Sequence, residues 1–227
     1  MENPFFRFVG KVVDLVWLNI LTLVCSLPIF TMGAAITAMY RVLLNAAMNE
    51  ETPVTVEFFK AFKNNFKKAT LVFIPEMLIL TIFLSNAYLI YQGVLAPLGN
   101  LYIPVGIAIG FLALFVIAVA TYYFAIISRY DTDIKTALKN AVLLDFAYFP
   151  KSLCMLVILA SPIAVCMISD YFVWFWFLYG ISFPAYLIAM LIGGIFLKLE
   201  DANEKKNVES EAPEDGQGTM ESDVEEG

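Results

Sequence analysis

The segment from residue 103 to residue 127 reads IPVGIAIGFLALFVIAVATYYFAII, and it decides the fold class. It contains no charged residue, and it is longer than the roughly 20 apolar residues with which an α-helix crosses the hydrocarbon core of a bilayer. A helix that is apolar on every face needs lipid or other protein around it. The segment therefore predicts a transmembrane helix.

Comparable apolar runs lie on both sides of this segment. Three are clear: Ala69–Tyr91, Leu153–Ile168 and Tyr171–Leu197. The first fifty residues hold two more, Phe8–Leu27, which can cross, and Ile29–Met48, which is either a second crossing or a shallow re-entrant helix. The composition agrees, because 60% of the residues are hydrophobic and only 15% are charged, against about 25% charged in soluble domains. The sequence thus predicts an all-α fold, a polytopic transmembrane helical bundle.

The positions of lysine and arginine separate five spans from six, because cytoplasmic loops are enriched in these residues. If Ile29–Met48 does not cross, the chain has five spans, and Arg7 and Lys11 lie outside. If it crosses, both termini and all 14 Lys and Arg residues lie on the cytoplasmic side. We therefore favour six spans in the cell membrane, with a cytoplasmic C-terminus.

An acidic segment ends the chain. Residues 200–227 hold eleven acidic and two basic residues, so they carry a charge of −9, whereas the rest of the chain carries +2 and the whole carries −7. The segment lacks aromatic residues and cannot bury enough apolar surface to fold. We predict a transmembrane domain over residues 1–199 and a disordered tail over residues 200–227. The acidic charge of the tail does not indicate a nucleic-acid partner.

The residue types exclude several kinds of chemistry. The chain has no histidine, which removes the Ser-His-Asp triad and every histidine-ligated metal or haem site. It also lacks a phosphate-binding loop, a dinucleotide-binding glycine motif and a CxxC pair. Its three cysteines lie in apolar runs, which favours inert thiols: Cys25, Cys154 and Cys166. We expect no catalytic residues, no cofactor and no metal site, and the protein is not expected to be an enzyme.

Two of the predicted cytoplasmic links have helical patterns. In Val54–Lys68, four phenylalanines fall on one side and three lysines on the other: Phe58, Phe59, Phe62 and Phe66 against Lys60, Lys63 and Lys67. Such a basic helix either lies flat on anionic headgroups or docks on the bundle. In Asp131–Tyr148, an apolar stripe of Ile134, Leu138, Ala141 and Val142 also includes Asp145, which becomes a candidate docking residue for a partner.

Ionisable residues inside spans are costly and therefore informative. Arg41 lies inside Ile29–Met48, and Glu76 lies inside Ala69–Tyr91 directly after Pro75. At about 1.5 Å per residue, both are roughly 9–10 Å deep on the same side of the membrane. We predict that Arg41 and Glu76 form an intramembrane polar pair, which either docks two helices or belongs to a ligand or ion pathway.

Small and aromatic residues form two further patterns. Gly106 and Gly110 make a GxxxG motif, and Gly33, Ala34, Thr37 and Ala38 make a second small-residue face. Both favour close packing inside the bundle over a dimer interface. The aromatic run Tyr171–Tyr179 is typical of an interfacial belt, and stacking on a sugar ring is the alternative.

The stretch from Leu18 to Tyr40 has the pattern LNxLxxxCSLPxxTxGxAxxAxY. With this pattern, and with FFKAFKNNFK at residues 58–67 and IKTALKNA at residues 134–141, the chain resembles the YesL-like family of bacterial membrane proteins of unknown function over about residues 1–199. The resemblance implies no activity and no catalytic residues. Members are often associated with carbohydrate-uptake systems, so it implies an accessory role beside a sugar transporter.

Three classes of function follow. The leading hypothesis is a non-enzymatic protein that assists or regulates a carbohydrate-uptake transport system through its cytoplasmic loops, with the bilayer and transporter subunits as partners. The alternative is a permease-like transport subunit in its own right, because Asp131–Pro150 resembles the loop by which importer permeases dock on their ATPase, although it lacks the central glycine. The third class is an intramembrane enzyme, which no residue pattern supports.

Overall fold

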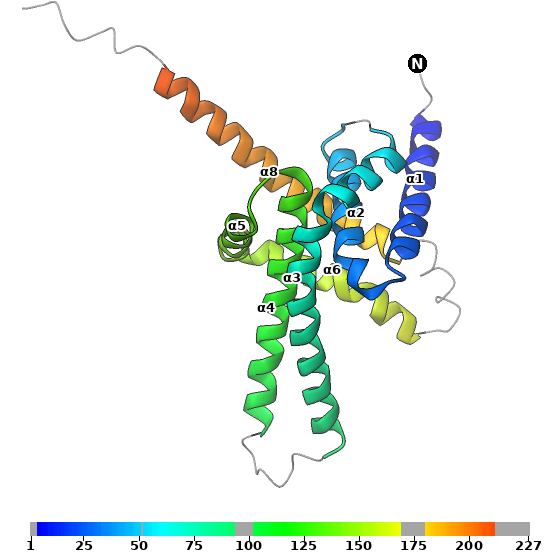
Figure 1. Cartoon of the computed structure of the whole chain (residues 1–227), viewed down its shortest axis with the longest axis vertical. Coiled ribbons are helices and arrows are strands. Elements are labelled where there is room, and N and C mark those ends of the chain that lie inside the picture. Colours follow the sequence, from blue (N-terminus) through cyan, green and yellow to red (C-terminus); the bar gives the residue numbers. More distant parts are fainter. Residues whose placement is uncertain (1–3, 51, 94–101, 169–179, 212–227) are drawn as a thin grey trace, which may run out of the picture. The chain divides into compact units, whose positions relative to one another are not determined.

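The structure is a computed structural model that describes residues 4–50, 52–93, 102–168 and 180–211. No β-strand occurs among these residues, and the predicted all-α fold is confirmed (Figure 1). The elements are α1 (Pro4–Cys25), the short 3₁₀ helix η1 (Ile29–Thr31), α2 (Met32–Ala47), α3 (Val54–Tyr91), α4 (Tyr102–Arg129), α5 (Ile134–Ala147), α6 (Phe149–Ile168) and α8 (Ser182–Glu211).

The chain divides into two compact units within α8, residues 1–193 and residues 194–227. In the second unit, α8 continues to Glu211, so residues 200–211 are helical where the sequence predicted a disordered tail. A helix that has already formed adds one hydrogen bond for each further residue, and the Glu, Lys and Ala residues here are good helix formers. Residues 212–227 lie outside the described residues.

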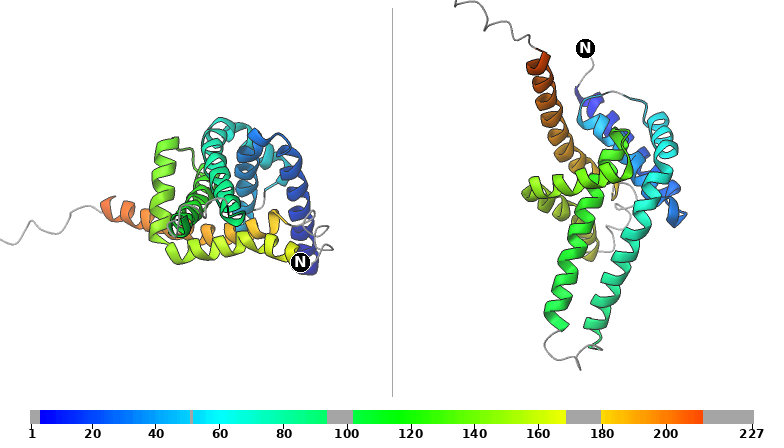
Figure 2. Two further views of the ribbon diagram at one scale, coloured as in Figure 1. Left: turned by 90° about the horizontal axis from the view of Figure 1, so that it is seen from below. Right: turned by 60° about the vertical axis from the view of Figure 1, so that its left-hand side comes forward.

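Helices α3 and α4 run side by side as an antiparallel pair in both sets of views (Figures 1 and 2). The GxxxG motif of α4 faces α3, since a Cβ added at Gly106 would lie 2.5 Å from Ile90 Cδ1 and one at Gly110 would lie 3.4 Å from Phe83. The predicted internal role of this motif is therefore confirmed. Large apolar side chains of both helices remain exposed, among them Leu78 at 61% and Phe111 at 70%, as expected for surfaces that face lipid.

Helix α2 is the most deeply buried element of the first unit, with Ala34, Ala35, Ala38 and Leu44 fully enclosed. A Cβ at Gly33 would lie 2.6 Å from Phe73 Cβ and 3.0 Å from the Ala69 carbonyl oxygen, so glycine permits α2 and α3 to approach closely. The second small-residue face is thus also an internal packing surface.

Helices α5 and α6 meet at Tyr148 with a bend of 99°. Both views show α6 running across the α3–α4 pair rather than alongside it (Figures 1 and 2). The predicted span Leu153–Ile168 therefore belongs to a bent pair, which is either a broken span or a re-entrant loop.

Within the described residues, four helices are long and apolar enough to cross a membrane, or five if the bent pair counts as one span. The four include Ile29–Ala47, the segment that the sequence left open, but they do not include α1. A total of six spans requires that α1 cross as well. The predicted six spans stay a prediction.

Candidate functional site

Arg41 links three helices at one end of the first unit. Its Nε donates to Glu57 Oε2 of α3 at 3.4 Å, and its Nη1 lies 3.5 Å from the carbonyl oxygens of both Ser128 and Arg129. These carbonyls belong to the last turn of α4, where oxygens lack partners within the helix and attract a cation. The guanidinium therefore caps α4 while it holds α2 against α3.

Two further ion pairs each join one of the neighbouring links to a helix. Arg129 Nη1 lies 3.2 Å from Glu50 Oε1, which joins the end of α4 to the α2–α3 link. Lys68 Nζ donates to Asp131 Oδ1 at 2.7 Å and to the Thr132 carbonyl oxygen at 3.0 Å, which joins α3 to the α4–α5 link. The hydrogen bond and the charge of Lys68 lower the pKa of the Asp131 carboxyl below its ordinary value.

Several of these residues line a cavity of about 400 Å³ between α2, α3 and the end of α4. Its lining is mostly polar and carries both signs of charge, with Arg41, Glu57, Lys60, Asn64, Arg129 and Asp131 among its residues. We call Arg41, Glu50, Glu57, Lys68, Arg129 and Asp131 the charged cluster. The cluster can fix the two links as one surface and can present charge to a partner.

The predicted pair of Arg41 and Glu76 does not form. Arg41 pairs with Glu57 instead, and the buried Oε2 of Glu76 has no hydrogen-bond partner among the described residues. The prediction measured the depth of Glu76 in the membrane from residue 69, where the apolar run begins. In the structure, α3 begins at Val54 and is continuous to Tyr91. Because α2 and α3 are antiparallel, the C-terminal turns of α2 lie beside the first turns of α3, where Glu57 is found.

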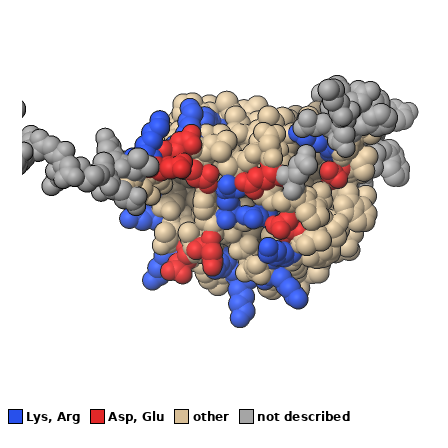
Figure 3. Space-filling model, turned by 90° about the horizontal axis from the view of Figure 1, so that it is seen from above, with Lys and Arg blue, Asp and Glu red and all other residues tan. Residues whose placement is uncertain are grey.

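The basic stripe of α3 is exposed, as its pattern predicted. Lys60, Lys63 and Lys67 are all exposed, and Figure 3 shows one face of the molecule on which Lys and Arg side chains are interspersed with Asp and Glu side chains. On the opposite side of the helix Phe58 is fully buried and stacks on Phe62, with ring centroids 6.3 Å apart. Phe59 is the exception among the four phenylalanines, since it is 48% exposed.

The segment 54–68 differs from the prediction in the extent of its helix. The segment 54–68 is not a separate interfacial helix, because it is the first part of the continuous helix α3. Its burial of Phe58 corresponds to the docking alternative.

Asp145 is not placed to bind a partner. It is only 3% exposed, and its Oδ1 lacks a hydrogen-bond partner among the described residues. Together with Ala137 and Ala141 it forms the buried face of α5, whereas Leu138 is 40% exposed. The prediction assumed that large apolar residues turn inward, but in a membrane the small residues permit close helix contact and the large ones can face lipid.

The sequence motif contains two polar residues whose structural role the sequence did not reveal. Asn19 of α1 is buried, and its Oδ1 accepts hydrogen bonds from the backbone N–H groups of Ile181 and Ser182, so it caps the start of α8. Thr31 Oγ1 donates toward the carbonyl oxygens of Cys25 and Pro28, which closes the turn between α1 and α2. The signal in the sequence for such a role was the presence of these two polar residues within an otherwise apolar motif.

Other predicted features lie partly outside the described residues. The aromatic run Tyr171–Tyr179 falls entirely in that part of the chain, and the side chain of Cys166 is not described. Cys25 and Cys154 are free thiols. The described residues contain no group of three or more Cys, Asp or Glu side chains that could hold a metal ion.

Comparison with known proteins gives one match. Residues 15–87 match the model of a family described as a protein of unknown function, DUF624. The match covers the second half of α1, all of α2 and most of α3, and it is consistent with the YesL-like resemblance of the Leu18–Tyr40 stretch. The comparisons with curated proteins and with solved structures gave no match. The chain is thus an integral membrane protein that matches, over this region, a family of unknown function.

Proposed function

We propose that the protein is a non-enzymatic accessory or regulatory component of a carbohydrate-uptake transport system in the cell membrane. The observation that carries the proposal is the charged cluster. Its ion pairs hold the α2–α3 link against the end of α4 and hold the α4–α5 link against α3, so that the exposed lysines of α3 stand on a fixed surface. A fixed charged surface suits recognition of a protein partner, because little side-chain and loop entropy is lost on binding.

We place this surface on the cytoplasmic side. Arg41, Lys68 and Arg129 of the charged cluster lie on or beside the part of α3 that carries the exposed lysines, and the positive-inside rule assigns a region rich in such residues to the cytoplasm. The C-terminus is also cytoplasmic in this arrangement if α8 crosses from the opposite side. The link to carbohydrate uptake is supported by the YesL-like resemblance alone.

The second candidate function is a permease-like transport subunit. It is supported by the sharp α5–α6 turn, where Phe146 and Phe149 are 68% and 62% exposed. Exposed aromatic residues on a bent helical pair resemble the loop with which importer permeases contact their ATPase. The two candidates thus assign partner binding to different surfaces, α3 in the first case and the α5–α6 turn in the second.

Affinity purification from native membranes in mild detergent, followed by mass spectrometry, tests both candidates. Three double variants are compared with the unchanged protein. Lys63→Glu with Lys67→Glu reverses charge on α3, Phe146→Ser with Phe149→Ser alters the turn, and Lys135→Glu with Lys139→Glu is a matched charge control on α5.

Co-purification of a complete sugar transporter that is lost only with the α3 variant supports the proposed accessory function. Co-purification of an ATPase that is lost only with the Phe146 and Phe149 variant favours the permease-like function. Equal loss with the α5 charge control would show that the association depends on general charge alone, and the accessory proposal would then be wrong.

A further inference from the structure

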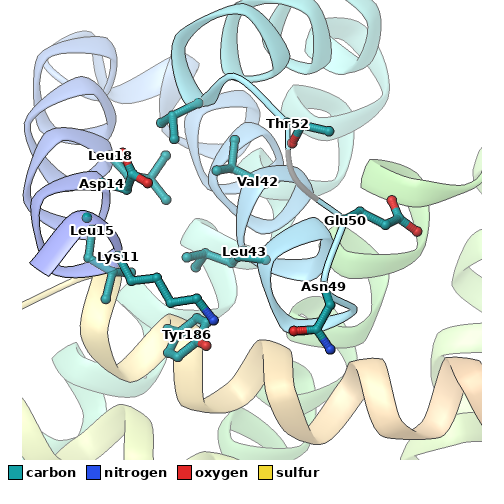
Figure 4. A pocket seen from close by; sticks show the side chains of 13 residues that line it. Lys11, Asp14, Leu15, Leu18, Val42, Leu43, Asn49, Glu50, Thr52 and Tyr186 are labelled. Carbon is teal, nitrogen blue, oxygen red and sulfur yellow. The ribbon is translucent and has the colours of Figure 1, made fainter. Parts of the chain in front are cut away.

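A second cavity, which shares only Glu50 with the charged cluster, lies between α1, α2 and the α2–α3 link. Its volume is about 380 Å³, within the range of roughly 300–1,000 Å³ that is typical of small-ligand sites. Tyr186, in the first turns of α8, completes the wall (Figure 4). The backbone of α1 is fixed here by a hydrogen bond from Ser182 Oγ to the Leu15 carbonyl oxygen at 2.9 Å. The cavity is therefore bounded by elements that contact each other.

The lining has two zones. Leu15, Leu18, Val42 and Leu43 form an apolar zone, and Leu18 and Leu43 belong to the buried core. Lys11, Asp14 and Asn49 form a polar zone; Figure 4 shows Lys11 reaching from α1 toward Tyr186, with Asn49 on the other side of the space. A ligand that matches both zones has an apolar part and a polar part.

Two charges of the polar zone are available to a ligand. Lys11 and Asp14 make no ion pair with each other or with any other residue that the structure describes, although they lie one helical turn apart. The other ionic group of the lining, Glu50, already pairs with Arg129, and the Thr52 hydroxyl accepts a hydrogen bond from Asn45. The cavity thus offers one free cation and one free anion among the described residues, which is complementary to a zwitterion.

The position of the cavity indicates where such a ligand would come from. Asn49, Glu50 and Thr52 of its lining belong to the link that also contributes to the charged cluster. Because charged loop residues favour the membrane surface, we place this link and the polar zone at the headgroup level of the bilayer. The apolar zone is formed by residues nearer the middle of α1 and α2. A lipid molecule at this boundary already has its headgroup and its chains at the matching depths.

We propose that this cavity binds the headgroup region of a zwitterionic phospholipid that carries a primary amine, as phosphatidylethanolamine does. The Lys11 ammonium pairs with the phosphate, and the Asp14 carboxylate accepts hydrogen bonds from the lipid amine. The glycerol and the first methylene groups lie along Leu15, Leu18 and Leu43, and the rest of the chains remain in the bilayer. A quaternary amine cannot donate such hydrogen bonds, so phosphatidylcholine is expected to bind less well.

Native mass spectrometry of the full chain in detergent, titrated with short-chain phosphatidylethanolamine, phosphatidylcholine and phosphatidylglycerol, tests this site. Phosphatidylethanolamine is expected to bind best. Lys11→Gln and Asp14→Asn should each weaken its binding about tenfold, which corresponds to about 1.4 kcal/mol. Both residues are exposed, so neither change should unfold the protein. The control Lys63→Gln removes an exposed lysine outside the cavity, and it should leave binding unchanged.

Three outcomes would overturn the proposal. If phosphatidylglycerol binds as tightly and only Lys11→Gln weakens binding, the site recognises anions rather than zwitterions. If the soluble headgroup phosphoethanolamine binds as tightly as the short-chain lipid, the ligand is a free metabolite rather than a lipid. If Lys63→Gln weakens binding as much as Lys11→Gln does, the lipid associates with basic surface in general.

Discussion

Arg41 is expected to be coupled to Glu57 in the free energy of unfolding. The two side chains are 28% and 16% exposed, so solvent screens their interaction only in part. Removal of Arg41 leaves Glu57 with Lys60 alone, at 3.7 Å, and removal of Glu57 leaves Arg41 with the carbonyl oxygens of α4 alone. We expect Arg41→Gln or Glu57→Gln to cost about 1–2 kcal/mol. The double variant should cost less than the sum of the two. Chemical unfolding in detergent measures all three values.

The matched control for this cycle is Arg41→Gln with Glu76→Gln, whose effects should add. Coupling between Arg41 and Glu76 as large as that between Arg41 and Glu57 would contradict the structure.

The partner of Arg41 also shows what the sequence could and could not predict at the scale of single residues. That Arg41 needs a partner followed from its charge in an apolar segment, but its choice of partner depends on the register of α2 against α3, which the Gly33–Phe73 contact sets.

The Lys68–Asp131 pair predicts a pH dependence. Lys68 lowers the pKa of Asp131 below its ordinary value of 3.8, so the folded state binds a proton here less readily than the unfolded state does. The stabilisation is therefore fully present above pH 3.8 and is lost as the pH falls through the lowered pKa. Asp131→Asn should lower the melting temperature at neutral pH, and this difference from the unchanged protein should vanish in strong acid.

Asp133→Asn is the matched control for this pH dependence. Asp133 is an exposed carboxylate two residues away, and it makes no ion pair with any described residue. Its replacement should leave the pH profile of the melting temperature unchanged. If both variants change the profile equally, the effect of Asp131 comes from general surface charge and not from Lys68.

At the scale of the helices, the contact between α2 and α3 depends on the absence of a side chain at Gly33. A Cβ there would lie 2.6 Å from Phe73 Cβ and 3.0 Å from the backbone oxygen of Ala69, so the helices must move apart. We expect Gly33→Ala to reduce the free energy of unfolding by about 1–3 kcal/mol. Gly194→Ala is the control, because no atom of the described residues lies within 4 Å of a Cβ at that position of α8, and it should be neutral or stabilising by up to about 1 kcal/mol. Equal losses for the two variants would show that α2 and α3 tolerate separation.

The helices themselves were the most predictable level of structure. Runs such as Ile103–Ile127 are too long and too apolar for any other structure in a membrane, and α4 contains that run whole. Helix faces were less predictable, because lipid accepts large apolar side chains as readily as protein does. The exposed Leu138 and the buried Ala137 of α5 illustrate this. Asp145 is a second example: it lies on the inside with the apolar stripe, as predicted, but its burial does not fit the predicted docking role.

For the molecule as a whole, the number of spans depends on whether α1 and the α5–α6 pair cross the membrane. Among the described residues, Ile29–Ala47 is long and apolar enough to cross, whereas α1 does not qualify, although charge placement favoured a crossing by both. A helix count from sequence cannot decide this, because α1 carries Arg7, Lys11 and Asp14 in its first half and its polar groups can lie at the interface whether or not it crosses. The bent α5–α6 pair leaves the same choice for the second half of the chain.

Cysteine labelling in intact cells with an impermeant reagent decides both questions. In a variant without native cysteines, single cysteines are placed at positions 2, 63 and 205. Six spans predict that all three are protected, because both termini and the start of α3 are then cytoplasmic. Labelling at position 2 alone would show that one of the first two helices does not cross, and labelling at position 205 alone would show that the α5–α6 pair is re-entrant. Permeabilised cells provide the control, since all three positions should then be labelled. Labelling at position 63 in intact cells would reverse the orientation, and it would remove the cytoplasmic surface on which the accessory function depends.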